Sequence, residues 1–190
     1  MSSTGRGTTR RPNDDYQSPP SAIAALLAHV KPSGTFHEPC AGSGNIIAEV
    51  RKVKEVTQVS WCELYPESGE GTDFLAYRIG PRKYDWIITN PPFSLACEFI
   101  DQSLRLAHNI ALLLRLNFLE SEDRREWWQT RRPTAIYVLS RRPSFLDRQG
   151  KRVLGKNGKP GTDSCAYGWF VWSRLYSGIH VIGDLPQQKK

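Results

Sequence analysis

The chain has 190 residues, of which 39% are hydrophobic and 24% are charged, and its formal net charge is +7 at pH 7. The length indicates about one domain, and the composition is that of a globular protein with enough apolar material for one core. No apolar run reaches the roughly 18 residues that a membrane-spanning helix needs. The surplus of positive charge favours a polyanionic partner, with nucleic acid first and an anionic membrane surface second.

The first 13 residues are rich in Ser, Thr, Gly and Arg and predict a disordered basic tail, which leaves residues 14–190 for a single domain. The polar segment 1–11 lacks the apolar centre of a secretory signal. Four scattered cysteines form no CxxC pair, namely Cys40, Cys62, Cys97 and Cys165. This spacing supports neither a disulfide framework nor a zinc site. We therefore expect no bound metal and a reducing compartment, the cytoplasm.

Patterns of helix and strand alternate along the first half of the chain. Residues 84–89 form a strongly apolar run that predicts a buried strand. Residues 73–75 are expected in a loop or short helix. The other predicted elements are a helix over 21–30, a strand over 35–38, a helix over 45–53 and a strand over 56–63.

The second half continues this alternation. Residues 110–116 are almost wholly apolar and predict a central parallel strand that is buried on both faces. Residues 141–163 lack apolar periodicity. The other predicted elements are a helix that includes Phe99 and Leu106, a charged helix over 120–131, and strands over 135–139 and 166–172. Alternating strands and helices indicate an α/β fold with βαβ units and a mostly parallel sheet.

A glycine-rich loop, Glu-Pro-Cys-Ala-Gly-Ser-Gly over residues 38–44, separates a predicted strand from a predicted helix. Glycines at such a place let the backbone approach a ligand, and the helix start offers free N–H groups. Ile47 stands where the dinucleotide fingerprint GxGxxG needs its third glycine, and the Walker lysine is also missing. The loop therefore argues against a dinucleotide and a triphosphate, and an ordinary turn stays open as the alternative.

Two acidic positions follow the glycine loop. Glu63 ends the second predicted strand about 20 residues later, where an acid can accept both hydroxyls of a ribose. Asp73 could accept from an adenine amino group while the Phe74 ring packs beside the base. A solvated loop acid is the alternative for each, and their position relative to the glycine loop favours binding.

The tetrapeptide Asn90-Pro91-Pro92-Phe93 follows the strand over 84–89, so it falls at a strand's carboxyl end, where open α/β sheets bind ligands. It offers a side-chain amide, carbonyls stiffened by two prolines, and an aromatic face. These groups suit a planar ring that carries an amino group. Asn-Pro-Pro is also common turn chemistry, but its position after a buried strand and the glycine loop favours a functional role.

A further segment, Asp-Asp-Tyr-Gln-Ser-Pro-Pro over residues 14–20, alone would indicate a turn before a helix. Taken together, the motifs resemble those of S-adenosylmethionine-dependent amino-group methyltransferases, and most of all the small phage and bacterial DNA N6-adenine methyltransferases. That family carries Asp-x-Tyr-x-Thr-Pro, then Pro-x-x-Gly-x-Gly, then Asn/Asp-Pro-Pro-Tyr/Phe. The counterparts here are Asp14, Tyr16, Ser18 and Pro19, then Pro39, Gly42 and Gly44, then Asn90 to Phe93.

The resemblance extends through residues 112–120 and 169–172, so it covers nearly the whole chain beyond the tail. Three positions depart from the family pattern: Ser18 replaces Thr, Cys40 stands where Phe is common, and Phe93 stands where Tyr is common. Many members carry a separate target-recognition domain, for which this chain has no room. The resemblance therefore indicates the chemistry and leaves the target sequence open.

The resemblance implies a Rossmann-like methyltransferase fold, with a mostly parallel seven-stranded sheet and helices on both faces. The implied reaction moves a methyl group from S-adenosylmethionine to the N6 amino group of adenine in DNA. The implied catalytic residues are Asn90, Pro91, Pro92 and Phe93. The implied cofactor-binding residues are Asp14, Tyr16, Ser18, Pro19, Glu38, Pro39, Gly42, Gly44, Glu63, Asp73, Phe74 and Asn90.

Our mechanistic hypothesis is that the Asn90 side-chain oxygen and the Pro91 carbonyl accept the two N6 hydrogens, while Phe93 stacks on the base. A base inside a duplex cannot reach such a pocket, so the adenine must be flipped out or lie in a single strand. An RNA N6-adenine methyltransferase is the first alternative. A protein glutamine methyltransferase and a nucleic-acid-binding protein without turnover are the others, and the oligomeric state is open.

Residues 141–163, called the basic segment, look like a mobile loop on the edge of the sheet that contacts backbone phosphates. A solvated insertion is the alternative. The cationic residues that carry this expectation are Arg141, Arg142, Arg148, Lys151, Arg152, Lys156 and Lys159. A second basic cluster surrounds Trp127 and Trp128, which we expect in the core rather than as stacking platforms; it comprises Arg124, Arg125, Arg131 and Arg132.

Overall fold

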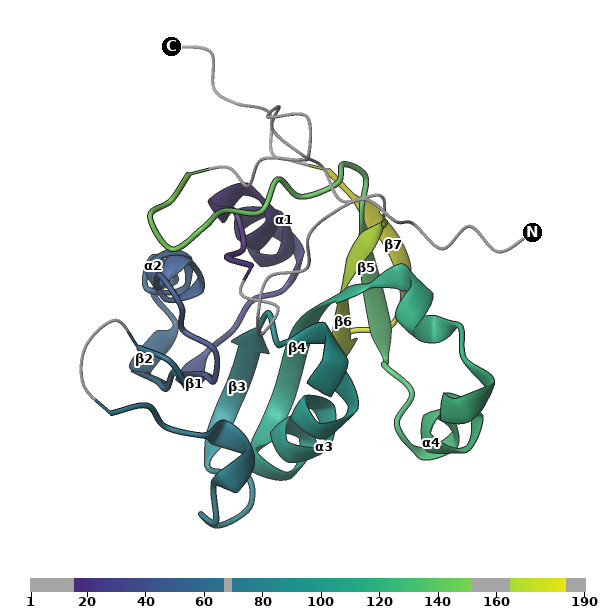
Figure 1. Ribbon diagram of the computed structural model, residues 1–190, viewed down its shortest axis with the longest axis horizontal. Coiled ribbons are helices and arrows are strands. Elements are labelled where there is room, and N and C mark those ends of the chain that lie inside the picture. Colours follow the sequence, from purple (N-terminus) through teal and green to yellow (C-terminus); the bar gives the residue numbers. More distant parts are fainter. Residues whose placement is uncertain (1–15, 67–69, 152–164, 184–190) are drawn as a thin grey trace.

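The structure is a computed structural model that describes residues 16–66, 70–151 and 165–183. Within them the chain forms a seven-stranded sheet in the order β2-β1-β3-β4-β6-β5-β7 (Figure 1). The fold class expected from the sequence is confirmed. The strands are β1 (Gly34–Glu38), β2 (Val56–Trp61), β3 (Tyr84–Thr89), β4 (Ala107–Arg115), β5 (Ala135–Leu139), β6 (Tyr167–Trp172) and β7 (Gly178–Ile182).

Helices cover both faces of the sheet. The α-helices are α1 (Pro20–His29), α2 (Asn45–Val50), α3 (Ala96–Leu106) and α4 (Arg125–Thr130). Short 3-10 turns are η2 (Phe74–Ala76), η3 (Phe93–Leu95), η4 (Leu116–Leu119) and η5 (Glu122–Arg124). The helix predicted over 120–131 is confirmed over 125–130 and wrong at its start. There Ser121 is extended, and the Arg124 guanidinium donates to the carbonyls of Phe118 and Glu120, which favours turns. None of the described helices is long and apolar enough to cross a bilayer.

The sheet is mixed, with β2, β1, β3 and β4 parallel to one another and β6 antiparallel to both of its neighbours. The strand predicted over 110–116 is buried and central in β4, but it is parallel only to β3, so that expectation is half wrong. The geometric reason is that β6 starts at the end of the sheet where β5 stops, so it runs back between β4 and β5. The edge strand β7, parallel to β5, was not located by the sequence pattern.

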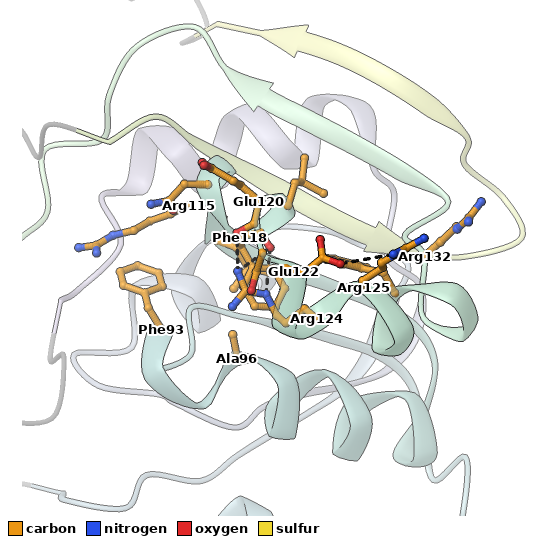
Figure 2. A pocket seen from close by; sticks show the side chains of 14 residues that line it. Phe93, Ala96, Arg115, Phe118, Glu120, Glu122, Arg124, Arg125 and Arg132 are labelled. Atoms are coloured by element: carbon orange, nitrogen blue, oxygen red, sulfur yellow. Dashed lines mark hydrogen bonds and ion pairs between the residues drawn. The ribbon is translucent and has the colours of Figure 1, made fainter. Parts of the chain in front are cut away.

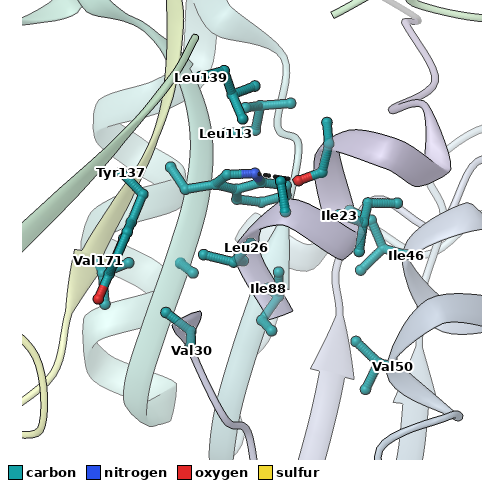
Figure 3. Packing of buried hydrophobic residues seen from close by; sticks show 14 of the residues in the cluster. Ile23, Leu26, Val30, Ile46, Val50, Ile88, Leu113, Tyr137, Leu139 and Val171 are labelled. Carbon is teal, nitrogen blue, oxygen red and sulfur yellow. Dashed lines mark hydrogen bonds between the residues drawn. The ribbon is translucent and has the colours of Figure 1, made fainter. Parts of the chain in front are cut away.

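Two apolar clusters fill the space between the sheet and its helices. On one face, Leu26 of α1, Val30 directly after it and Val50 of α2 pack in one cluster with Ile88 and Leu113 of the sheet (Figure 3). On the other face, α3 packs against β3 and β4. Burying a side chain of this size contributes about 1.5–3 kcal/mol, so both layers hold the strand ends rigidly in place.

The chain leaves β1 for β2 on one side and returns to β3 on the other side of β1. Open α/β sheets bind ligands at such a switch point, outside the carboxyl ends of the strands. Here the carboxyl ends are Glu38 and Thr89. The glycine loop and the Asn90–Phe93 tetrapeptide therefore leave the sheet side by side.

Candidate functional site

The glycine loop owes its shape to two glycines in the left-handed region. Gly42 has φ 50° and Gly44, which precedes α2, has φ 79°. Other residues pay about 1–2 kcal/mol for that conformation. The Gly42 N–H donates to Glu63 Oε2 at 2.8 Å, so the loop is tied to the segment that follows β2.

Gln17 lies directly against the glycine loop. Its Oε1 accepts hydrogen bonds from the Ser43 N–H at 2.8 Å and the Ser43 hydroxyl at 3.2 Å. A Cβ added at Gly42 would stand well under 3.0 Å from that oxygen, closer than real Cβ atoms approach a heavy atom. Gly42 is therefore needed for both its φ angle and its missing side chain.

The segment over residues 16–18 also holds the tetrapeptide. Asn90 Nδ2 donates to the Tyr16 carbonyl at 2.7 Å, and Asn45 Nδ2 donates to the Ser18 carbonyl at 3.0 Å. One short stretch of backbone thus joins the ends of β1 and β3.

This contact fixes the orientation of the Asn90 amide. With Nδ2 engaged, Asn90 Oδ1 is buried and has no hydrogen-bond partner among the described residues. Such an acceptor costs about 1–3 kcal/mol, which a ligand that donates a hydrogen bond would recover. The neighbouring Pro91 is buried, and the Pro92 carbonyl accepts from the Leu95 N–H at 3.0 Å, which begins η3.

A first cavity of about 490 Å³ lies at the switch point. It brings together seven residues predicted for the cofactor, namely Tyr16, Ser18, Pro39, Glu63, Asp73, Phe74 and Asn90. Glu38, Gly42 and Gly44 support it without lining it, and Pro19 is buried where α1 begins. Asp14 lies outside the described residues.

Glu63 is the most connected acid of this cavity. Besides Gly42, its carboxylate accepts from the Tyr65 N–H at 3.0 Å and from Arg148 Nη2 at 3.5 Å. Arg148 also donates to the Tyr65 carbonyl. Arg148, predicted for phosphate contact, therefore lies in the wall of the first cavity.

Asp73 and Phe74 also line the first cavity. Asp73 Oδ1 accepts from the Leu75 N–H at 2.8 Å and caps η2, although the residue is exposed. The Phe74 ring is buried and stacks on Phe99 with 5.5 Å between centroids. The ring is thus rigid, and its role beside a base stays a prediction.

Beneath the first cavity, burial raises the pKa of Glu38 well above its ordinary value, and the nearby Thr89 hydroxyl and Cys40 amide oppose this shift. Glu38 Oε1 accepts from the Cys40 N–H at 3.0 Å. Burial, with the charge of Lys83 second, lowers the pKa of His37 to about 4. Burial raises the pKa of Cys62 to about 11. Neutral forms of His37 and Cys62 are therefore favoured near pH 7.

A second cavity of about 920 Å³ lies on the other side of the tetrapeptide (Figure 2). Pro92 lines the first cavity and Phe93 the second, so the tetrapeptide separates the two. The Arg115 guanidinium carbon stands 4.8 Å from the centre of the Phe93 ring, and Arg115 Nε donates to the Tyr167 hydroxyl at 3.1 Å. Phe93 is thus held between an arginine and a second aromatic ring, 5.7 Å away.

No family model matches this chain, and no curated protein matches it. Several solved structures do match it in fold. A candidate RNA methyltransferase from Pyrococcus horikoshii is 13% identical and superposes with a TM-score of 0.57, over 87% of this chain and 91% of that one. A type I restriction-modification methyltransferase subunit from Streptococcus thermophilus is 12% identical, with a TM-score of 0.56 over 89% of this chain and 47% of that one.

A modification subunit of a candidate type I restriction enzyme from Vibrio vulnificus is 16% identical, with a TM-score of 0.58 over 93% of this chain and 48% of that one. The chain has a methyltransferase fold. It spans about half the length of the two restriction-system subunits. At these identities the likeness concerns the fold.

The described half of the basic segment, residues 141–151, does not lie on the edge of the sheet, so that expectation is wrong. Gln17 and Leu146 exchange two backbone hydrogen bonds of 3.0 Å, so the segment crosses the carboxyl end of the sheet above the glycine loop. Arg141, Arg142 and Lys151 are exposed. Arg152, Lys156 and Lys159 lie outside the described residues. Their contact with phosphate stays a prediction.

Several residues of the site escaped the sequence reasoning. Gln17 stands inside a motif that was recognised, and Asn45 directly follows the glycine loop, so their positions were a signal. The signal for Arg115 was weaker, because it is only the cationic residue at the end of an apolar strand. Among the described residues, no three His, Cys, Asp or Glu side chains converge to hold a metal ion.

Proposed function

We propose that the protein transfers a methyl group from S-adenosylmethionine to the N6 amino group of adenine in DNA. The observation that carries the proposal is Asn90, whose Oδ1 is buried without a partner among the described residues, in a tetrapeptide that separates two cavities. An exocyclic amine supplies the hydrogen-bond donor that this oxygen lacks. The methyltransferase fold and the net charge of +7 support the choice of reaction and of a polyanionic substrate.

The first cavity fits the cofactor in size, because small-molecule sites typically measure about 300–1,000 Å³. S-adenosylmethionine carries a sulfonium and an ammonium group against one carboxylate, and the cavity is lined by two acids and one arginine. Glu63 would accept from the ribose hydroxyls, Asp73 from the adenine amino group, and Phe74 would pack beside the ring. Asp14 belongs to the same proposal. When bound, the cofactor supplies a methyl group on a good leaving group.

The chain's own contribution is to position and activate the substrate amine. The N6 lone pair is delocalised into the adenine ring, so the nitrogen is a poor nucleophile. Asn90 Oδ1 and the Pro91 carbonyl accept its two hydrogens, which turns the lone pair toward the methyl carbon. The same dipoles stabilise the positive charge that develops as the N–C bond forms and the S–C bond breaks. The cofactor would leave as the neutral thioether S-adenosylhomocysteine, and the nitrogen would release its extra proton to water.

The test is Asn90→Ala with labelled S-adenosylmethionine. Loss of one preorganised dipole at a developing charge costs on the order of 10²–10³ in kcat. The dissociation constant for the cofactor should change far less. Duplex DNA, single-stranded DNA, RNA and glutamine-containing protein are assayed in parallel, and nucleoside digestion identifies the modified base.

Asn109→Ala is the matched control, since Asn109 bonds the Asp85 carbonyl and the Ser173 hydroxyl near the start of β4, at the other end of the sheet. The Asn109→Ala variant loses a comparable number of hydrogen bonds, but Asn109 has no proposed role in the reaction. At temperatures below the melting temperature of this variant, its kcat should therefore stay near that of the wild type. Methyl transfer by Asn90→Ala at the wild-type rate would overturn the assignment.

RNA is the second candidate substrate. The candidate RNA methyltransferase is matched over nearly its whole length, whereas the restriction subunits are matched over about half. The parallel assay separates these cases: N6-methyladenosine from RNA would favour this candidate, methylated glutamine would favour a protein substrate, and cofactor binding without transfer would indicate a binding protein.

A further inference from the structure

The two cavities differ in charge. The first is lined by two acids and one arginine, namely Glu63, Asp73 and Arg148. The second is lined by two acids and four arginines, namely Glu120, Glu122, Arg115, Arg124, Arg125 and Arg132. Figure 2 shows the second cavity running from Phe93 and Arg115 at one end to Arg132 at the other. A cavity of this charge and length suits an extended anion rather than a compact neutral ligand.

The arginines of the second cavity differ in how firmly they are held. Arg124 bonds the Phe118 and Glu120 carbonyls and stands 4.6 Å above the Phe118 ring, so it shapes the wall. Arg125 meets Glu122 at 3.3 Å with both side chains largely exposed, and such pairs contribute only about 0–1 kcal/mol. Arg132 is exposed. Arg125 and Arg132 can therefore turn toward a ligand at little cost.

Aromatic side chains line the same space. Phe118 and Trp128 meet edge to face with 5.3 Å between centroids, and both line the cavity along with Phe93. The Trp128 Nε1 donor has no acceptor among the described residues. Arginine planes and aromatic faces together are the elements that hold unstacked bases and their backbone.

We propose that the second cavity binds the polynucleotide strand that flanks the methylated adenine, with Arg125 and Arg132 in contact with its phosphates. The proposal rests on the proposed function and adds where the polymer lies. The sequence placed the principal phosphate contact in the basic segment; the proposal places it instead in the stretch from η4 to α4 and at Arg132. Phosphate contacts supply most of the affinity of a nucleic-acid complex and fix its register.

The position of the basic segment supports this choice. Its described half is paired with Gln17, and its Arg148 faces Glu63, so this half borders the first cavity. The second cavity instead begins at Phe93, the residue that the mechanism requires next to the target base. A strand that presents adenine to the tetrapeptide continues most directly along the second cavity.

The test uses the full chain and fluorescein-labelled 20-mers of single-stranded DNA, duplex DNA and RNA, with anisotropy measured over a salt series. The variant is Arg125→Ala with Arg132→Ala. The matched control is Arg142→Ala with Lys151→Ala, which removes the same charge from the basic segment. Each lost phosphate contact lowers the salt slope by about 0.7–0.9. The cavity variant should thus lose about 1.4–1.8 in slope, which raises Kd by about 25- to 60-fold at 0.1 M salt.

The control should keep most of its slope, and calorimetry should give both variants the cofactor affinity of the wild type. Because both arginines are exposed, the cavity variant should keep its melting temperature; should it unfold, Arg132→Glu and the charge-preserving Arg132→Lys take its place, with loss of slope expected only for the first. An equal or larger loss in the control would overturn the proposal in favour of the basic segment.

A wild-type chain that binds the cofactor but no polynucleotide would also overturn the proposal. Methylation of a glutamine peptide in that case would refute the nucleic-acid part of the proposed function as well. Methyl transfer to a polynucleotide with an unchanged slope in the cavity variant would refute the placement alone.

Discussion

Replacing Gly42 by alanine tests how the glycine loop is built. Gly42 combines φ 50° with contact against Gln17, whereas Gly44 has φ 79° and open space around its Cα, and Gly80 has neither constraint. The three alanine substitutions therefore separate backbone strain from steric conflict. Gly80→Ala is the matched control.

The expected costs follow from these contacts. Gly44→Ala adds only the left-handed strain of about 1–2 kcal/mol. Gly42→Ala adds the same strain and also displaces Gln17, which loses two hydrogen bonds from Ser43 at about 0.5–1.5 kcal/mol each. The total for Gly42 is about 2–5 kcal/mol. Gly80→Ala should change stability by less than about 1 kcal/mol.

Urea unfolding gives the free energy of unfolding of each variant, and calorimetry gives its Kd for S-adenosylmethionine. If the loop must keep its shape to bind, the extra 1–3 kcal/mol at Gly42 relative to Gly44 corresponds to about 5- to 150-fold in Kd. Gln17→Ala combined with Gly42→Ala should cost less than the sum of the two single changes. Equal losses at Gly42 and Gly44, with additive behaviour at Gln17, would refute the steric part of the reasoning.

Three further substitutions test the site. Glu63→Ala removes the acceptor of the Gly42 N–H and the partner of Arg148, so calorimetry should report at least about a tenfold rise in Kd for the cofactor; an unchanged Kd would exclude Glu63 from binding. Burial raises the pKa of Glu38, and a raised carboxyl pKa destabilises the fold increasingly as pH rises above the unfolded value of 4.5. Glu38→Gln should therefore unfold at higher urea than the wild type at pH 8, with the difference vanishing toward pH 4.5, and the opposite trend would count against the assigned burial. Phe93→Ala should raise the KM for nucleic acid by about tenfold or more through lost stacking, while Phe93→Tyr retains it; equal KM values in a steady-state assay would argue against stacking.

The sequence predicted most of the fold because most strands are buried. The strands over 84–89 and 135–139 have the predicted bounds, since each is a short apolar run between turn signals. Strand β7 was not predicted because four of its five residues are exposed, so its apolar residues do not show the pattern of a buried strand. The direction of β6 escaped for another reason: apolar periodicity reports burial and carries no information on which way a strand runs.

The site was predictable where the chain itself places residues at strand ends. The glycine loop and the tetrapeptide follow β1 and β3 directly, so their proximity follows from a parallel sheet alone. The contact of Arg148 with Glu63 joins residues 85 positions apart, and Arg148 lies in a stretch, residues 141–151, that forms no helix or strand of the sheet. Sequence patterns cannot predict such a pairing, because charge and spacing alone made Arg148 equally suitable for phosphate.

The segment over residues 16–18 couples the glycine loop to the Asn90–Phe93 tetrapeptide. Its Gln17 side chain holds the glycine loop, and its Tyr16 carbonyl fixes the Asn90 amide through Nδ2. Without that bond the amide could turn and present a donor where the proposed reaction needs an acceptor. Because the same three residues contact the loop beside the first cavity and the amide that we propose binds the substrate, any change that displaces them should weaken cofactor binding and methyl transfer together.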